Sequence, residues 1–299
     1  MRKSRILLLL LCVLLSFSFL SGCAKDINNF SSSNSLTVYF FDVGQADSSL
    51  LIFPDNTIML IDAGNRADGD KIAQQLDNMG IESLDYFVLT HPHEDHIGGA
   101  ADIFEYLEVS TVCMPSIDES FLPDTEVFSD TLSAIENEKC KTLYLSSNTN
   151  IVQKNDYSVL AVSPDTNSIY SNLNDYSLTL LVNCYTNTLL FTGDAEEACE
   201  LDMLNGDFNL DADILKAGHH GSSTASTTAF LEKVTPLATV ISSGKGNSYN
   251  HPHGEALERL NKIGSQIYRT DTVGTIIAKC YNGGFNIETN NNICLDGNK

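Results

Sequence analysis

The chain has 299 residues, of which 42% are hydrophobic and 19% are charged, a composition that suits a globular protein and argues against a disordered one. It has 17 Lys and Arg against 39 Asp and Glu, so its formal net charge is −22. Modules that bind nucleic acid by neutralising phosphates are basic, and this charge excludes a simple module of that kind. It does not exclude an enzyme that meets a phosphate through bound metal ions.

Residues 1–22 have the pattern of a signal peptide. Basic residues precede a mainly apolar stretch at 6–20, which is shorter than the ~20 residues that a membrane-spanning helix needs. The next residues, Leu-Ser-Gly-Cys, resemble a bacterial lipobox, which would make Cys23 the lipidated first residue. An ordinary signal peptide or an uncleaved anchor is the alternative. Without the leader, 14 basic and 39 acidic residues remain, and the net charge becomes −25.

The leader and Cys23 together predict a bacterial lipoprotein that lies outside the cytoplasm and is anchored in the cell membrane. Residues 23–35 are rich in Asn and Ser and read as a flexible tether. Six cysteines remain after Cys12 and Cys23, which permits up to three disulfides, but their spacing does not determine the pairing. Cys113 and Cys184 lie in apolar, strand-like runs, so we expect both to be buried.

Short strands and helices alternate along the next part of the chain. Apolar runs predict strands at residues 36–41, 49–53, 58–61, 84–90 and 111–114. Helical spacing predicts helices at residues 70–79, 97–107 and part of 121–138.

The second half of the chain shows the same alternation of short strands and helices. Strands are expected at residues 142–146, 157–162, 178–184, 188–192, 212–216, 238–242, 266–269 and 275–280. Helices are expected at residues 195–204, 227–234 and 255–263. Two sheets packed face to face with helices outside would satisfy this α/β pattern. We expect one domain at 36–290 and a C-terminal tail at 291–299.

All seven histidines fall into three tight clusters, at residues 91–96, 219–220 and 251–253. The first cluster reads THPHEDHIGG and joins a predicted strand to a predicted helix. A loop there can direct His91 and His93 at one metal ion, and Asp95 and His96 at a second. Imidazole and carboxylate groups suit zinc or manganese. In a purely structural alternative, Asp95 only caps the helix.

This HxHxDH pattern resembles the metallo-β-lactamase superfamily, and three further motifs match in order. Asp62-Ala63-Gly64 resembles the superfamily's first, structural Asp motif, Thr192-Gly193-Asp194 resembles its bridging Asp motif, and the segment 217–222 resembles its final His motif. The resemblance implies a four-layer αββα sandwich that holds two divalent metal ions, Zn²⁺ or Mn²⁺, and no organic cofactor.

The resemblance narrows to the ComEC-type competence branch through residues 41–48, 90–99, 215–222 and 243–253. Teichoic-acid phosphorylcholine esterases are similar. Full ComEC-type proteins also have a membrane channel, so the resemblance does not imply DNA transport by this chain alone.

The resemblance implies six metal ligands, which are His91, His93, Asp95, His96, Asp194 and His219. Asp194 would bridge the two ions. His219 is the preferred ligand of the pair 219–220, with His220 touching a substrate oxygen, but the order could be reversed.

One departure concerns the first ion. Many superfamily members supply it with a third His, yet residues 97–218 contain no His. Asn174 or Asp175 could take that place, or both could be ordinary turn residues.

The catalytic assignments follow from the same resemblance. A hydroxide activated by two metal ions would attack the substrate, with Asp95, His220 and His253 as catalytic residues. The segment 243–253 would bind a phosphate or protonate the leaving group through Lys245, His251 or His253, and Ser222 could donate a hydrogen bond to the same oxyanion. A surface turn at 251–253 is the alternative.

The leading hypothesis is therefore an exported, lipid-anchored phosphodiesterase or nuclease that acts on DNA, and we expect a monomer. The net charge of −25 opposes tight binding of a polyanion. A phosphorylcholine or teichoic-acid diester is therefore a rival substrate, and a lactone or β-lactam remains open. A surface lipoprotein that binds DNA without catalysis is the alternative from a different class.

Overall fold

The computed structural model describes residues 34–290. The predicted signal peptide at 1–22, Cys23, the tether up to residue 33 and the tail at 291–299 all lie outside these residues. Within the described part of the chain, no helix has both the length and the apolar character needed to cross a bilayer.

The first sheet is built mainly from the N-terminal half of the chain. Its strands are β1 (Ser35–Phe40), β2 (Ser49–Ile52), β3 (Ile58–Ile61), β4 (Ser83–Val88), β5 (Glu108–Pro115), β6 (Lys141–Leu145), β14 (Thr275–Tyr281) and β15 (Gly284–Asn290). They lie in the order β15-β14-β1-β2-β3-β4-β5-β6. Strands β3 to β6 are parallel, whereas β15 to β3 pair antiparallel.

The second sheet comes from the C-terminal half. Its strands are β7 (Thr149–Gln153), β8 (Tyr157–Ala161), β9 (Leu180–Cys184), β10 (Asn187–Phe191), β11 (Ile214–Lys216), β12 (Ala238–Ile241) and β13 (Gln266–Arg269). They lie in the order β13-β12-β11-β10-β9-β8-β7. Strands β10 to β13 are parallel and the others pair antiparallel.

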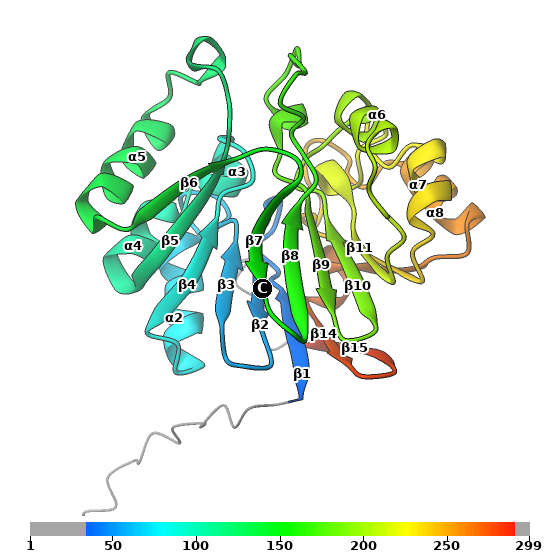
Figure 1. The fold of residues 1–299 in the computed structure, drawn as a ribbon, viewed down its shortest axis with the longest axis horizontal. Coiled ribbons are helices and arrows are strands. Elements are labelled where there is room, and N and C mark those ends of the chain that lie inside the picture. The colour runs from blue at the N-terminus through cyan, green and yellow to red at the C-terminus, as the bar shows by residue number, and fades with distance from the viewer. Residues whose placement is uncertain (1–33, 291–299) are drawn as a thin grey trace, which may run out of the picture. The chain divides into compact units, whose positions relative to one another are not determined.

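Helices cover the outer faces of the two sheets (Figure 1). The first sheet carries α2 (Gly69–Asn78), α4 (Ala100–Tyr106) and α5 (Glu126–Glu138), and the second carries α6 (Glu197–Asn205), α7 (Thr228–Val234) and α8 (Gly254–Lys262). Short helices lie in the connections at α3 (Glu94–Ile97), α9 (Thr270–Val273), η1 (Glu119–Phe121), η2 (Asn174–Tyr176) and η3 (Gly218–Gly221). The predicted four-layer αββα arrangement is confirmed.

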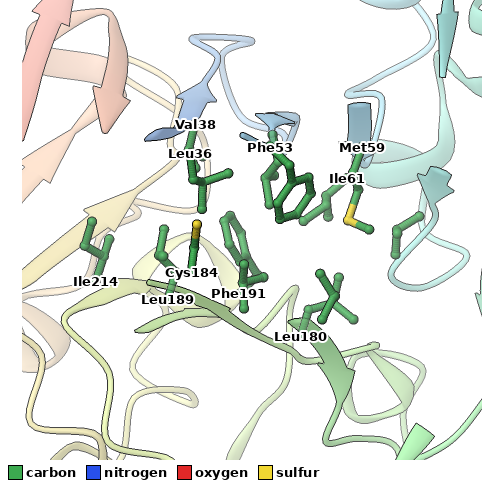
Figure 2. Close-up of a cluster of buried hydrophobic side chains, with 14 of the residues drawn as sticks. Leu36, Val38, Phe53, Met59, Ile61, Leu180, Cys184, Leu189, Phe191 and Ile214 are labelled. Atoms are coloured by element: carbon green, nitrogen blue, oxygen red, sulfur yellow. The ribbon is translucent and has the colours of Figure 1, made fainter. Parts of the chain in front are cut away.

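The central core lies between the two sheets (Figure 2). In β1 the buried residues alternate along the strand, so Leu36, Val38 and Phe40 all face the second sheet. The ring of Phe40 stacks on that of Phe191 in β10, with 5.7 Å between the ring centroids. This apolar layer holds the two sheets in a fixed relation, so their loops are held in place at the sandwich edge.

Two predicted features differ from the structure. The helix predicted at 97–107 is split into α3 and α4 at Gly98 and Gly99, where the backbone passes very close to the segment 63–66. A Cβ on Gly98 would lie 2.3 Å from the backbone nitrogen of Arg66, which explains why glycine occupies this point. Strands β7 and β15 were not predicted, because both are polar edge strands without the apolar run that marks a buried strand.

The described cysteines are free thiols, at positions 113, 140, 184, 199 and 280. Cys113 and Cys184 are buried in the central core, as predicted. The disulfides that the cysteine count permitted are therefore absent among residues 34–290.

The packing between the sheets predicts that truncating one of its aromatic side chains lowers the free energy of unfolding substantially. Phe191→Ala should lower the free energy of unfolding by about 3–5 kcal/mol, because the side chain is almost fully buried and its loss leaves a cavity. Urea unfolding followed by circular dichroism would measure this difference. Leu237→Ala, at a position that is 61% exposed, should change the same free energy by less than about 0.5 kcal/mol. Equal effects of the two substitutions would contradict this account of the core.

A buried carboxylate in α6 fastens the segment that leads into α7. Glu200 accepts hydrogen bonds from the backbone nitrogens of Ser226 and Thr227. Arg259 of α8 holds the same segment from the other side, through bonds to the backbone oxygens of Ala225 and Ser226. Burial raises the pKa of Glu200 to about 7.

This raised pKa predicts a dependence of stability on pH. The folded state binds the Glu200 proton more tightly than the unfolded state, so this stabilisation is complete below about pH 4.5 and is lost as the pH rises through 7. Between pH 5 and pH 8 the wild type should lose up to about 3 kcal/mol more than Glu200→Gln, measured by urea unfolding. Parallel pH profiles for the two proteins would rule out this role for Glu200.

Candidate metal centre

The sequence motifs meet where parallel strands of both sheets end. In the first sheet β3 and β4 are parallel, and they lead directly into Asp62 and the histidine segment 90–96. In the second sheet β10, β11 and β12 are parallel, and they lead into Asp194, the segment 217–222 and the segment 242–253. Carboxyl ends of parallel strands lie at one edge of a sheet, so residues far apart in the sequence become neighbours.

Asp62 holds the first histidine segment in place through hydrogen bonds. Its side chain is buried and accepts hydrogen bonds from the backbone nitrogen and the hydroxyl of Thr90, at 2.8 and 2.7 Å. It also lies 2.8 Å from Nδ1 of His96. Since a carboxylate only accepts, Nδ1 of His96 carries a proton, so the neutral ring would have its lone pair on Nε2, the atom that faces Asp194. A carboxylate that holds the far nitrogen of a histidine in this way fixes the ring with its other nitrogen toward a metal site.

Asp194 lies at the centre of the histidines and is only 2% exposed. Its Oδ1 is 3.2 Å from Nε2 of His96. Its Oδ2 is 3.7 Å from Nε2 of His220, 3.8 Å from Nε2 of His219 and 4.0 Å from Nε2 of His91. The Asp194 carboxylate therefore has imidazoles on both of its oxygens, as the predicted bridging position requires.

Asp194 and three neighbouring side chains form a group of four candidate ligands. Asp95, His96, Asp194 and His220 each offer one ligand atom, and these atoms lie within 4.8 Å of one another. Nδ1 of His220 donates to the backbone oxygen of Ser242 at 3.1 Å, and its Nε2 donates to Oδ2 of Asp95 at 3.1 Å, where a metal ion would replace the Nε2 proton. The geometry thus favours His220 over His219 as the ligand. The sequence favoured His219 and left this reverse order open.

The donor atoms of this group fit a divalent cation. Nε2 of His96 and Oδ1 of Asp194 are buried, and neither has a hydrogen-bond partner. Unpaired buried polar atoms are costly, and a cation between them would satisfy both. Burial lowers the pKa of His96, but the nearby carboxylates of Asp194 and Asp62 outweigh it and raise that pKa well above its usual value. The carboxylates thus favour a positive charge at this point.

A second group of donors lies on the other side of Asp194. Nε2 of His91 and Nδ1 of His93 are within hydrogen-bond distance of each other, at 3.0 Å, and Nε2 of His91 lies 4.0 Å from Oδ2 of Asp194. Burial, together with neighbouring histidines, lowers the pKa of both rings, so they are neutral near pH 7, as metal ligands must be. His91 and His93 are therefore a looser pair of candidate ligands beside Asp194, outside the four-residue group.

Asn174 and Asp175, the two alternatives for a missing third ligand, are placed differently. Both side-chain oxygens of Asp175 are engaged, since Oδ1 accepts from the backbone nitrogens of Glu196 and Cys199 and Oδ2 accepts from Asn172. Oδ1 of Asn174 is buried without a hydrogen-bond partner. Of these two residues, Asn174 is therefore the one with a side-chain oxygen that is available to a metal ion.

His219 faces the centre from its open side. Its Nδ1 lies 2.7 Å from Oε1 of Glu196, and its side chain is 25% exposed. Both His219 and His220 have positive φ angles, 46° and 53°, in the left-handed region that non-glycine residues rarely adopt. This strained turn directs two consecutive imidazoles at Asp194, a use of backbone strain that is common at functional sites.

A sequence model of the "Metallo-beta-lactamase superfamily" matches residues 42–245. The chain belongs to this superfamily.

Competence proteins are among its relatives. The chain is 30% identical over 256 residues to "ComE operon protein 3" of Bacillus subtilis, with 80% of this chain and 32% of the relative covered. It is 28% identical to "Competence protein ComA" of Neisseria gonorrhoeae, with 81% and 32% covered. The chain thus spans about a third of the length of these relatives. The predicted resemblance to the competence branch of the superfamily is confirmed.

Solved structures support the fold. The metallo-beta-lactamase fold protein YhfI from Bacillus subtilis aligns with a TM-score of 0.51 at 11% identity, covering 85% of this chain and 100% of that one. At this identity the likeness shows the fold alone.

In this superfamily member several of the candidate ligands, Asp95, Asp194 and His220 among them, line an open pocket of about 290 Å³. The lining residues are Gln45, His93, Glu94, Asp95, Asn174, Asp194, His219, His220, Tyr249 and His251. None of them is Lys or Arg.

The predicted substrate-binding residues are only partly brought together. His251 lines the pocket, whereas Lys245, His253 and Ser222 do not. Both ring nitrogens of His253 are engaged, because Nδ1 accepts from the backbone nitrogen of Ser223 and Nε2 lies 3.1 Å from the backbone oxygen of Tyr249. Ser222 bonds to the hydroxyl of Thr224. These contacts give His253 and Ser222 a part in holding the loops beside the pocket in place.

Sequence reasoning did not assign roles to several residues at the site. Asp47 and Lys216 form a buried ion pair of 2.8 Å that joins the two sheets near the candidate ligands. The backbone nitrogen of Asp47 also donates a hydrogen bond to the backbone oxygen of Asp95. Glu196 and Gln45 are also new. Gln45 and Asp47 lie in the segment 41–48 that carried the resemblance, but Glu196 is one of 39 acidic residues and had no distinguishing signal.

The contacts of Asp62 predict that it controls metal affinity without binding the metal. In Asp62→Asn the amide nitrogen would face Nδ1 of His96, so the His96 proton would move to Nε2 and block the ligand position. Zn²⁺ affinity, measured by competition with a coloured chelator, should fall by about 10–100-fold. The matched control is Asp55→Asn in the β2–β3 turn, where the carboxylate accepts from Tyr157 at the other end of β3. Equal Zn²⁺ affinities of the two variants would contradict this role.

Proposed function

We propose that this member of the superfamily is an exported, lipid-anchored metal-dependent hydrolase that cleaves phosphodiester bonds, with DNA as its preferred substrate. The observation that carries the proposal is the buried cluster around Asp194. There, Nε2 of His96 and Oδ1 of Asp194 lie 3.2 Å apart without hydrogen-bond partners, and Asp194 lines an open pocket.

Two groups of side chains would hold two divalent ions. Asp95, His96 and His220 would hold one, with Asp194 between them and the second group. His91 and His93 would hold the other, and Oδ1 of Asn174 offers it a further oxygen in place of a third His. When bound, a pair of divalent ions such as Zn²⁺ or Mn²⁺ would activate water near neutral pH and offset the charge on the phosphoryl oxygens.

The chain's own residues would then orient the substrate. Asp95 lines the pocket and is hydrogen-bonded to His220, and its carboxylate would orient a water molecule and accept a proton from it. His219 and His251 line the pocket above the ligands and can donate hydrogen bonds to phosphoryl oxygens. This assigns to His219 the substrate contact that the sequence analysis gave to His220.

DNA is preferred because the relatives are competence proteins, namely "ComE operon protein 3" and "Competence protein ComA". Lipid attachment at Cys23 would hold the hydrolase at the outer surface of the cell membrane. Both parts are proposals, since the chain covers only about a third of those relatives and Cys23 lies outside the described residues.

A small phosphodiester is the second candidate, and the pocket composition favours it. The lining contains no Lys or Arg to meet neighbouring phosphates, and it includes Glu94 as well as the ligand carboxylates. A polyanion would be repelled beyond the metal ions, whereas a diester with one phosphate and an uncharged or cationic partner would not.

An activity assay separates these candidates. The chain from residue 24 onward, loaded with Mn²⁺ or Zn²⁺, would be given labelled single-stranded DNA, bis(p-nitrophenyl) phosphate and p-nitrophenyl phosphorylcholine. Asp95→Asn should lower kcat/KM by at least ~100-fold through loss of a ligand. The control is Glu105→Gln on α4, an exposed position outside the pocket, which should match the wild type.

Each result of this assay has one meaning. Metal-dependent DNA cleavage that is lost in Asp95→Asn supports the nuclease. Cleavage of the small diesters alone moves the function to the second candidate. Bound metal with no turnover on any diester contradicts the phosphodiesterase and favours a protein that binds without catalysis.

A further inference from the structure

Gln45 connects the two halves of the domain at the rim of the pocket. It lies in the loop between β1 and β2, and its side chain contacts the segment that follows β12, on the other sheet. The contact is close, because a Cβ placed on Gly244 would lie 2.7 Å from the backbone nitrogen of Gln45. Gln45 also lines the pocket, together with His251.

The orientation of the Gln45 amide is fixed by a backbone group. The N–H of Gly244 can only donate, and it lies 3.1 Å from Oε1 of Gln45. Oε1 is therefore the atom that faces Gly244, and the amide cannot be flipped without losing this bond. The amide nitrogen Nε2 is consequently the atom that faces Nδ1 of His251, at 3.4 Å.

This orientation decides which nitrogen of His251 carries the proton. An amide nitrogen can only donate, so Nδ1 of His251 must accept, and its proton lies on Nε2. Among residues 34–290, no hydrogen-bond partner of Nε2 of His251 is found.

The rest of the His251 residue is held independently of Gln45. Asn247 bonds to both the backbone nitrogen and the backbone oxygen of His251, at 3.0 and 2.6 Å. The ring of Tyr249 stacks on the His251 ring with 5.7 Å between centroids, and the ring of His219 meets its edge at 5.3 Å. Asn247 and the ring contacts place the imidazole, and Gln45 sets its tautomer.

We propose that Gln45 is a positioning residue that fixes His251 as the Nε2–H tautomer, so that His251 donates a hydrogen bond to a phosphoryl oxygen of the substrate. The tautomer follows from contacts within the chain. The contact with substrate rests on the proposed phosphodiesterase function.

The test uses Gln45→Glu, which changes one atom type and little else. The carboxylate keeps an acceptor for the N–H of Gly244 but offers His251 a second acceptor in place of a donor. At pH 8.5 the His251 ring is neutral, and its proton should move to Nδ1, which leaves a lone pair facing the pocket. Gln74→Glu, the same change at an exposed position on α2, is the matched control.

Two readouts separate the two parts of the proposal. Nitrogen NMR of the ¹⁵N-histidine-labelled, Zn²⁺-loaded chain reports the tautomer without any substrate, and His251→Gln assigns the signal. We expect Nε2–H in the wild type and in Gln74→Glu, and Nδ1–H in Gln45→Glu. For the diester that the wild type cleaves, kcat/KM should fall about 10–100-fold in Gln45→Glu, the cost of losing a hydrogen bond to a charged group.

Other results would overturn the proposal. If the proton of His251 lies on Nδ1 in the wild type, or if the spectra of wild type and Gln45→Glu agree, Gln45 does not set the tautomer. A shifted tautomer with unchanged kcat/KM would show that His251 makes no contact with the substrate. A wild type without activity on any diester would overturn the proposed function and the substrate contact, while the spectra would still decide the role of Gln45.

Discussion

Negative charge buried at the junction of the two sheets is the constraint on which the rest of the site depends. Asp47, Asp62 and Asp194 are each at most 4% exposed, and within the described residues Lys216 is the buried cation that meets one of them. Ionised carboxylates are costly to bury unless opposite charge or hydrogen bonds compensate them. Asp62 accepts hydrogen bonds from Thr90, whereas the side chain of Asp194 lies among the imidazoles of His96 and His220 and close to a further carboxylate, that of Asp95. A bound cation would compensate this charge.

The sandwich architecture brings this charge to a single place. The apolar layer between the sheets, with Phe40 stacked on Phe191, sets how the strand ends of one sheet meet those of the other. The Asp47–Lys216 pair then joins the two sheets directly behind the ligands. Gln45 makes a similar connection at the rim, through Gly244 and His251. The site is therefore a property of the junction, and neither sheet alone contains it.

Much of this could be predicted from the sequence because the decisive residues follow strands. Asp62, Asp194 and the segment 90–96 each come directly after an apolar run, and parallel strands place such residues together. The order of His219 and His220 could not be predicted, because it depends on two consecutive left-handed residues. The role of Glu196 was hidden for another reason, since its significance lies in a contact with His219 and not in its residue type. The polar edge strands β7 and β15 lacked the apolar pattern by which strands are found.

The central claim is that the buried cluster around Asp194 holds two divalent ions. The most direct measurement is a crystal structure of the chain grown with Zn²⁺, with anomalous diffraction recorded above and below the zinc absorption edge. The account predicts two anomalous peaks about 3.5–4 Å apart, one beside Asp95, His96 and His220 and one beside His91 and His93, with Asp194 touching both. A single peak, or none among these residues, would contradict it.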